Sequence, residues 1–194
     1  MAKFKILLVI VFIISLIILF KFSMGKRILI KSDVDNKYYL VRDLNDKQRA
    51  ANMLATIHKN IIKIVDILNN KKNSDYKEFE KYINQLSERA NNVVISETAG
   101  NSSYTSYSVN KGEELVFCLR SKHDNNMHNM NILMYVVLHE ISHIACPEYG
   151  HTNLFKKIFA FITDVAISHN MYNKIDFDKD PKEYCGLIIT ESII

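Results

Sequence analysis

The stretch Met134-Tyr-Val-Val-Leu-His-Glu-Ile-Ser-His-Ile144 places the motif H-E-x-x-H inside an apolar run. Residues four apart lie on one face of an α-helix, so His139 and His143 can present imidazole nitrogens to one metal ion. Glu140 is the neighbour of the first histidine and can reach a water on that ion. This spacing is typical of a zinc hydrolase.

The residues that flank the motif predict how the chain continues. Apolar side chains recur at helical spacing without Gly or Pro, and Pro147 is expected to end the helix. Gly150 can adopt the positive φ that reverses the chain, so that His151 folds back as a third ligand. Three neutral imidazoles and one water are the open coordination of catalytic zinc. Thr152 is a candidate N-cap for a second amphipathic helix behind the site.

Alternatives to this ligand set remain open. Glu148 or Asp164 can replace His151 as third ligand, because carboxylates serve in other zinc sites. His139 and His143 can also be ordinary core residues, with His151 a surface residue of the turn. Cys146 lies close in sequence, but a thiolate suits a structural site, so we interpret it as a packing residue or one half of a disulfide.

The predicted chemistry is amide hydrolysis. Zinc would lower the pKa of its bound water toward about 7 and polarise the scissile carbonyl, while Glu140 acts as general base on that water. The proton would then pass to the leaving amine. Tyr149, Tyr172 and Tyr184 are candidates for the oxyanion donor by residue type alone.

The N-terminus contains an apolar segment, residues 6–20, in which only Ser15 is polar. A helix of this length covers about 22 Å, so a span across a hydrocarbon core of about 30 Å must extend over residues 4–24. A cleavable signal peptide is the alternative, but the small residues needed before a cut are poorly matched. The sequence therefore favours a single-pass membrane protein whose partner is the lipid bilayer.

This interpretation divides the chain into a membrane anchor, residues 1–25, and a catalytic domain, residues 26–194. The cations after the span outnumber those before it, which favours the cytosolic side for the domain. The net charge of +4 is modest and partly lies beside the span, so no nucleic-acid partner is expected. Three cysteines imply no disulfide framework, although one pair can form in a lumenal domain.

Hydrophobic periodicity predicts an α+β domain with helices packed on a small mixed sheet. The expected elements are a strand hairpin at 27–31 and 38–41, a helix from a capping box at Asn45 and Gln48 to about residue 70, a helix at 75–91, and extended segments at 93–95 and 109–119. Leu115–Leu119 is the candidate edge strand for binding a peptide by strand addition, an ordinary sheet strand being the alternative. His58, His123 and His128 are expected at the surface.

The run His139–His143, followed by Gly150, His151 and Phe155, resembles the minimal zincin domains of the WLM and SprT-like metallopeptidases. The resemblance covers roughly residues 106–185. It implies a zincin-like fold in which His139, His143 and His151 bind zinc and Glu140 is the catalytic acid/base.

The chain also resembles small zincin-like proteins predicted in large DNA viruses, which share runs similar to Tyr107–Gly112 and Asp180–Gly186. The resemblance implies no substrate. The third histidine comes eight residues after the second, which differs from the metzincin pattern.

The sequence thus predicts a membrane-anchored zinc endopeptidase that acts on a protein or peptide. One alternative is a non-catalytic virion or host-membrane protein with a structural zinc site, which would have no use for Glu140. The other is a zinc amidase on a non-protein substrate, which would keep the same residues. The oligomeric state stays open.

Overall fold

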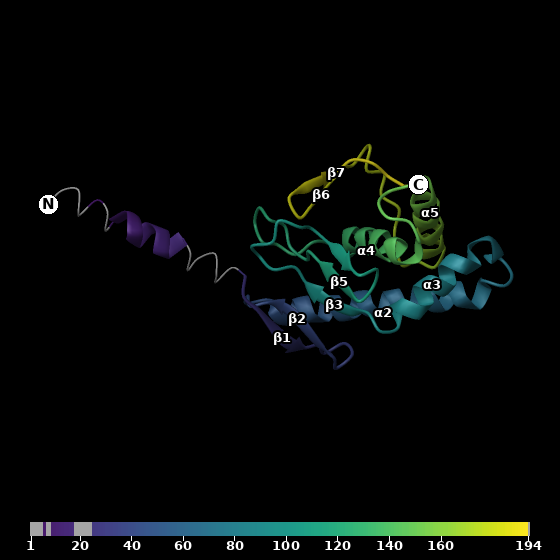
Figure 1. The fold of residues 1–194 in the computed structure, drawn as a ribbon, viewed down its shortest axis with the longest axis horizontal. Coiled ribbons are helices and arrows are strands. Elements are labelled where there is room, and N and C mark those ends of the chain that lie inside the picture. The colour runs from purple at the N-terminus through teal and green to yellow at the C-terminus, as the bar shows by residue number, and fades with distance from the viewer. Residues whose placement is uncertain (1–5, 7–8, 18–24, 194) are drawn as a thin grey trace.

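The computed structural model describes residues 6, 9–17 and 25–193, and these residues form an α+β fold, as predicted (Figure 1). The elements in chain order are β1 (Arg27–Lys31), β2 (Tyr38–Arg42), α2 (Lys47–Lys71), the 3-10 helix η1 (Lys77–Phe79), α3 (Glu80–Ala90), β3 (Val94–Glu97), β4 (Tyr107–Val109), β5 (Glu114–Phe117), α4 (Met130–Ala145), α5 (Asn153–Ser168), β6 (Lys182–Tyr184) and β7 (Leu187–Ile189).

The main sheet has the strand order β1-β2-β3-β5-β4. β1 and β2 form an antiparallel hairpin, which confirms the predicted one. β3 is parallel to both β2 and β5, and the parallel step from β2 requires a long crossover, which α2 and α3 supply. β4 pairs antiparallel with β5 and lies at the edge of the sheet.

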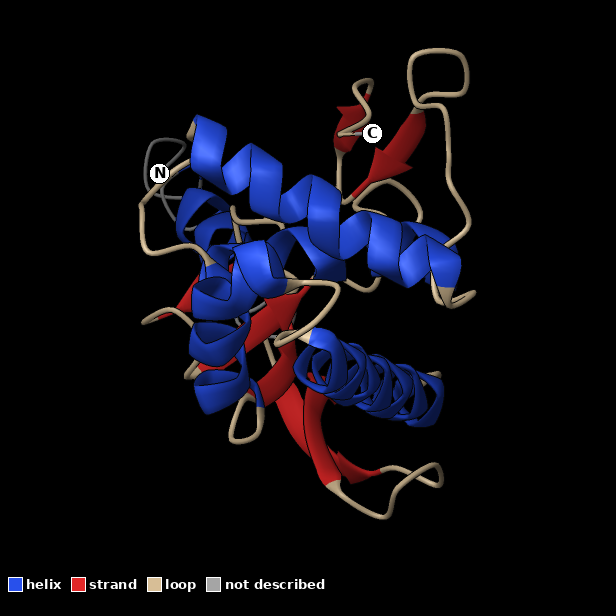
Figure 2. Cartoon of the chain, turned by 90° about the vertical axis from the view of Figure 1, so that its right-hand side faces the viewer, coloured by secondary structure: helices blue, strands red, loops and turns tan. Residues whose placement is uncertain are grey.

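Helices cover the sheet face that carries alternate apolar side chains such as Val41, Ile95 and Phe117, all of which are buried. α2 packs against β1, β2 and β3, and α4 contacts α2, α3, α5 and β4. β6 and β7 form a second, two-stranded sheet, which lies above the main sheet in the view of Figure 1 and at the upper right in Figure 2. α4, which carries the H-E-x-x-H motif, is therefore the central element of the domain.

The structure contradicts two local predictions, the capping box at Asn45 and Gln48 and the single extended segment 109–119. The capping box is absent, because α2 begins at Lys47 with Asp46 as N-cap and no side-chain cap bond. The Asp46 carboxylate instead pairs with the buried Arg120. The single extended segment 109–119 is broken by a turn in which three consecutive residues, Asn110–Gly112, have positive φ.

The expectation of a single-pass membrane protein is contradicted. Within the described ranges, no helix combines the length and the apolar character needed to cross a bilayer. The long helix α2 is amphipathic and carries charged residues. Much of the predicted span, at 4–5, 7–8 and 18–24, lies outside the described residues.

Candidate metal centre

The H-E-x-x-H motif lies in the last two turns of α4, where backbone preferences fix both ends of the helix. The Asn129 side chain accepts a hydrogen bond from the Asn131 N–H and caps the start. The helix ends at Ala145, because Cys146 precedes Pro147 and adopts an extended conformation. Gly150 then takes a φ of 77°, and the chain reverses as predicted.

Three histidine side chains converge beyond this turn. Their Nε2 atoms form a nearly equilateral triangle, with separations of 3.1 Å for His139–His143, 3.2 Å for His143–His151 and 3.1 Å for His139–His151. A tetrahedral zinc ion bound at about 2.0–2.1 Å needs its nitrogens about 3.3 Å apart. The three imidazoles are thus a donor set that fits zinc.

α5 supports the triangle from behind. Thr152 caps this helix by accepting a hydrogen bond from the Phe155 N–H, which confirms the predicted N-cap. The Phe155 ring stacks on His143 with centroids 4.1 Å apart and meets His139 and His151 at 5.1 and 5.0 Å. One buried aromatic ring therefore contacts all three imidazoles and limits their rotation.

The surroundings of the histidines favour the neutral, metal-binding form. Burial, with a smaller contribution from the other imidazoles, lowers the pKa of His139 to about 3. Burial also lowers the pKa of His143 to about 4, with smaller electrostatic contributions from the neighbouring His151 and Lys111. Metal ions bind the unprotonated ring, so both residues are ready to bind at neutral pH.

Glu140 is 6% exposed and lines the same cleft as the histidines. Burial raises the pKa of its carboxyl to about 7, a range suited to proton transfer near neutral pH. Among the described residues it has no hydrogen-bond partner and no salt bridge. This carboxyl is therefore not engaged in holding the fold together.

The alternatives for the third ligand are not brought to the cluster. The described residues that could share one ion are His139, His143 and His151, whose ligand atoms lie within 4.8 Å of one another. Glu148 lines the cleft outside this group, and Asp164 is exposed on α5. The free Cys146 is fully buried, which agrees with its interpretation as a packing residue.

The triangle opens into a cleft of about 780 Å³. The walls are the edge strand β4, the loop 148–151, part of α4 and the β6–β7 hairpin. The predicted edge strand is wrong, because β5 lies inside the sheet, between β3 and β4. β4 is the strand that borders the cleft and offers a free edge there.

The three tyrosines suggested as oxyanion donors have different surroundings. Tyr149 is 84% exposed at the rim of the cleft, and Tyr172 is buried against Tyr135. Tyr184 is buried in the cleft wall, where its hydroxyl lies 2.5 Å from that of Ser106. Only Tyr184 combines burial with a place in the cleft.

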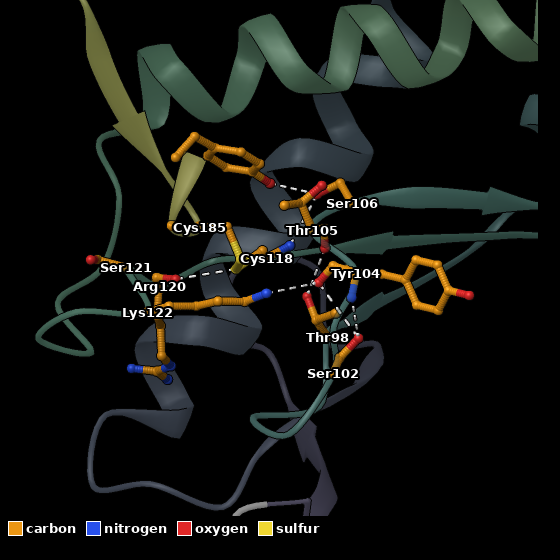
Figure 3. Close-up of a disulfide and its surroundings, with 12 residues drawn as sticks. Thr98, Ser102, Tyr104, Thr105, Ser106, Cys118, Arg120, Ser121, Lys122 and Cys185 are labelled. Atoms are coloured by element: carbon orange, nitrogen blue, oxygen red, sulfur yellow. Dashed lines mark hydrogen bonds between the residues drawn. A yellow bond between two sulfur atoms is a disulfide. The ribbon is translucent and has the colours of Figure 1, made fainter. Parts of the chain in front are cut away.

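The β6–β7 hairpin is a wall that the sequence did not predict. A disulfide between Cys118 and Cys185 joins it to the end of β5 (Figure 3). His128 is buried beneath it, contrary to expectation, and its Nε2 accepts a hydrogen bond from the Cys185 N–H. His123 is exposed, as expected, and His58 is half-buried with its Nδ1 3.1 Å from the Tyr39 hydroxyl. Paired cysteines 67 residues apart leave no local sequence signal.

Comparison with known proteins gives viral relatives. No family model matches the chain. It is 44% identical over 165 residues to uncharacterized protein R325 of Acanthamoeba polyphaga mimivirus, covering 85% of this chain and 83% of that protein. The chain belongs to the R325 family.

Two further relatives come from invertebrate iridescent viruses. Uncharacterized protein 136R of virus 6 is 33% identical over 49% of this chain, and uncharacterized protein 042R of virus 3 is 36% identical over 42%. The chain covers 54% and 50% of their lengths. These viral relatives agree with the viral part of the sequence prediction.

A solved structure was also found. The crystal structure of Wss1 from Saccharomyces cerevisiae matches 52% of this chain and 84% of its own, with 17% identity and a TM-score of 0.36. At this level the similarity carries no argument about the chain's function.

Proposed function

We propose that residues 26–194 form a zincin-like, zinc-dependent peptidase domain. The observation that carries the proposal is the triangle of His139, His143 and His151 in one cleft with the buried, unpaired carboxyl of Glu140. A structural metal site has no need of such a carboxyl, whereas hydrolysis needs a base at this position.

Each residue has a defined part in this proposal. The three histidines hold the ion, which when bound supplies a Lewis acid for a substrate carbonyl and for water. Glu140 takes the proton from the attacking water and delivers it to the leaving amine. Its raised pKa lets it act in both directions near pH 7.

The edge strand supports a peptide as the substrate. Among the strands of the described residues, β4 has a neighbour on one side only, so its other edge can pair with an extended peptide. Because Tyr107 and Ser108 line the cleft, a peptide paired there would pass the histidine triangle. Tyr184 is the proposed donor to the developing oxyanion, by its buried position in the cleft wall.

The test compares Glu140→Gln with His151→Ala. Glu140→Gln should keep one zinc per chain and lose about 10²–10⁴-fold in the rate of peptide cleavage, since it removes only the base. His151→Ala should lose zinc itself. Metal content by mass spectrometry and cleavage of a peptide library measure the two effects on the same samples.

The outcomes separate the competing functions. Undiminished cleavage by Glu140→Gln would refute the role of the carboxyl. Zinc without cleavage in the wild type would favour a structural site or a zinc amidase on a non-protein substrate. Full zinc occupancy in His151→Ala would exclude that residue as a ligand.

A further inference from the structure

The loop of residues 147–151, which ends at His151, is exposed and makes few stabilising contacts. Residues 147–151 are all exposed, and a Cβ added at Gly150 would meet nothing within 4 Å. Among the described residues, hydrogen bonds from another element reach the backbone of 147–150 only from Lys111. A ligand at the end of such a loop needs an external support.

The ammonium of Lys111 supplies this support. Its Nζ donates to the carbonyl oxygens of Cys146 at 2.9 Å, Pro147 at 2.7 Å and Glu148 at 3.2 Å. The same Nζ lies 4.2 Å from the centroid of the Tyr149 ring. One charge thus contacts four consecutive residues, and these contacts use all three ammonium protons.

The backbone of Lys111 is itself firmly placed. It lies in the β4–β5 turn with a φ of 53°, a conformation that non-glycine residues rarely adopt. The Arg89 side chain donates to the Lys111 carbonyl at 2.8 Å. Gly112 packs so closely on Ile144 that an added Cβ would lie 3.1 Å from it. The β4–β5 turn therefore packs closely against the C-terminal end of α4.

From this arrangement we infer that Lys111 is a positioning residue for the metal centre. It fixes the loop between α4 and Gly150, and so holds the His151 imidazole against those of His139 and His143. The inference rests on the proposed function, because it assigns the support of the third ligand. Removal of the ammonium would leave all three histidines in the chain, but the loop that carries His151 would lose its support.

The test uses Lys111→Met, which keeps most of the hydrocarbon chain and removes the charge. Lys59→Met is the matched control, since Lys59 donates to a single carbonyl, that of Val34, and does not line the cleft. In the metal-free full-length protein, the backbone amide NMR order parameters of residues 148–151 should fall below about 0.6 in Lys111→Met and stay at the wild-type values in the control. Unchanged order parameters in Lys111→Met would overturn the inference.

The second measurement is titration with Co²⁺, followed by its visible absorption. Lys111→Met should bind Co²⁺ about 10–100-fold more weakly than the wild type, the usual effect of losing a residue that supports a ligand. Lys111→Cys alkylated with bromoethylamine regains an ammonium at nearly the same length and should recover the affinity. Wild-type affinity in Lys111→Met, or a loss without recovery, would overturn the positioning role.

The two measurements distinguish failure of this inference from failure of the proposed function. A wild-type protein that binds no Co²⁺ would refute the proposed metal centre. The order parameters of residues 148–151 would still decide whether Lys111 holds the loop.

Discussion

The imidazole of His128 is 8% exposed, and its Nε2 accepts the N–H of Cys185 at 3.1 Å. Burial lowers its pKa below the ordinary value of about 6.5, and the nearby Glu183 and Asp124 only partly offset this effect. The folded state therefore resists protonation more than the unfolded chain does. The stability that neutral His128 contributes is complete above about pH 6.5 and is lost as the pH falls toward its lowered pKa.

We expect acidification from pH 7.5 to 5 to reduce the free energy of unfolding less in His128→Gln than in the wild type. Urea unfolding at a series of pH values measures the difference. His123→Gln, at an exposed position in the same loop, should follow the wild type. Parallel pH profiles for all three proteins would contradict the assignment to His128.

At the scale of elements, the disulfide between Cys118 and Cys185 joins the β6–β7 hairpin to the end of β5. Closing a loop of this size, with a sequence separation of 67, stabilises a fold by about 4 kcal/mol through the unfolded chain. The double variant Cys118→Ala/Cys185→Ala should lose about this much free energy of unfolding in urea. It should also raise KM for a peptide, because the disulfide shown in Figure 3 anchors the hairpin, and β6 of that hairpin ends at Tyr184.

Cys146→Ala is the control, since this cysteine is free and its loss leaves the disulfide intact. A cost below about 1 kcal/mol in the double variant would show that other contacts hold the hairpin. The Tyr184–Ser106 and His128–Cys185 bonds would then be the candidates.

At the scale of the whole molecule, the histidines of the proposed metal centre lie on α4 and on the loop before α5. A ligand that binds only the folded state stabilises it by mass action, by about 2.7 kcal/mol at a concentration 100 times its Kd. Zinc should therefore raise the melting temperature of the wild type, and a chelator should reverse the change. His151→Ala should show a much smaller shift. An equal shift in that variant would place the bound zinc elsewhere.

The sequence by itself determined the parts that depend on neighbours along the chain. The helical period of α4 sets His139 and His143 on one face, Pro147 ends the helix, and Gly150 and Thr152 shape the return to α5. These are preferences of a few consecutive residues, so they can be read without knowledge of the fold. The convergence of three histidines follows from them almost directly.

Only the tertiary structure decided which distant segments meet. Four features depend on residues far apart in sequence. They are the position of β4 at the sheet edge, the disulfide between Cys118 and Cys185, the burial of His128, and the hydrogen bonds from Lys111 to the loop after α4. Such contacts depend on how the sheet and helices pack together, and no local preference of the chain encodes them. The sequence could therefore predict which three histidines converge, whereas the walls and the support of the cleft required the fold.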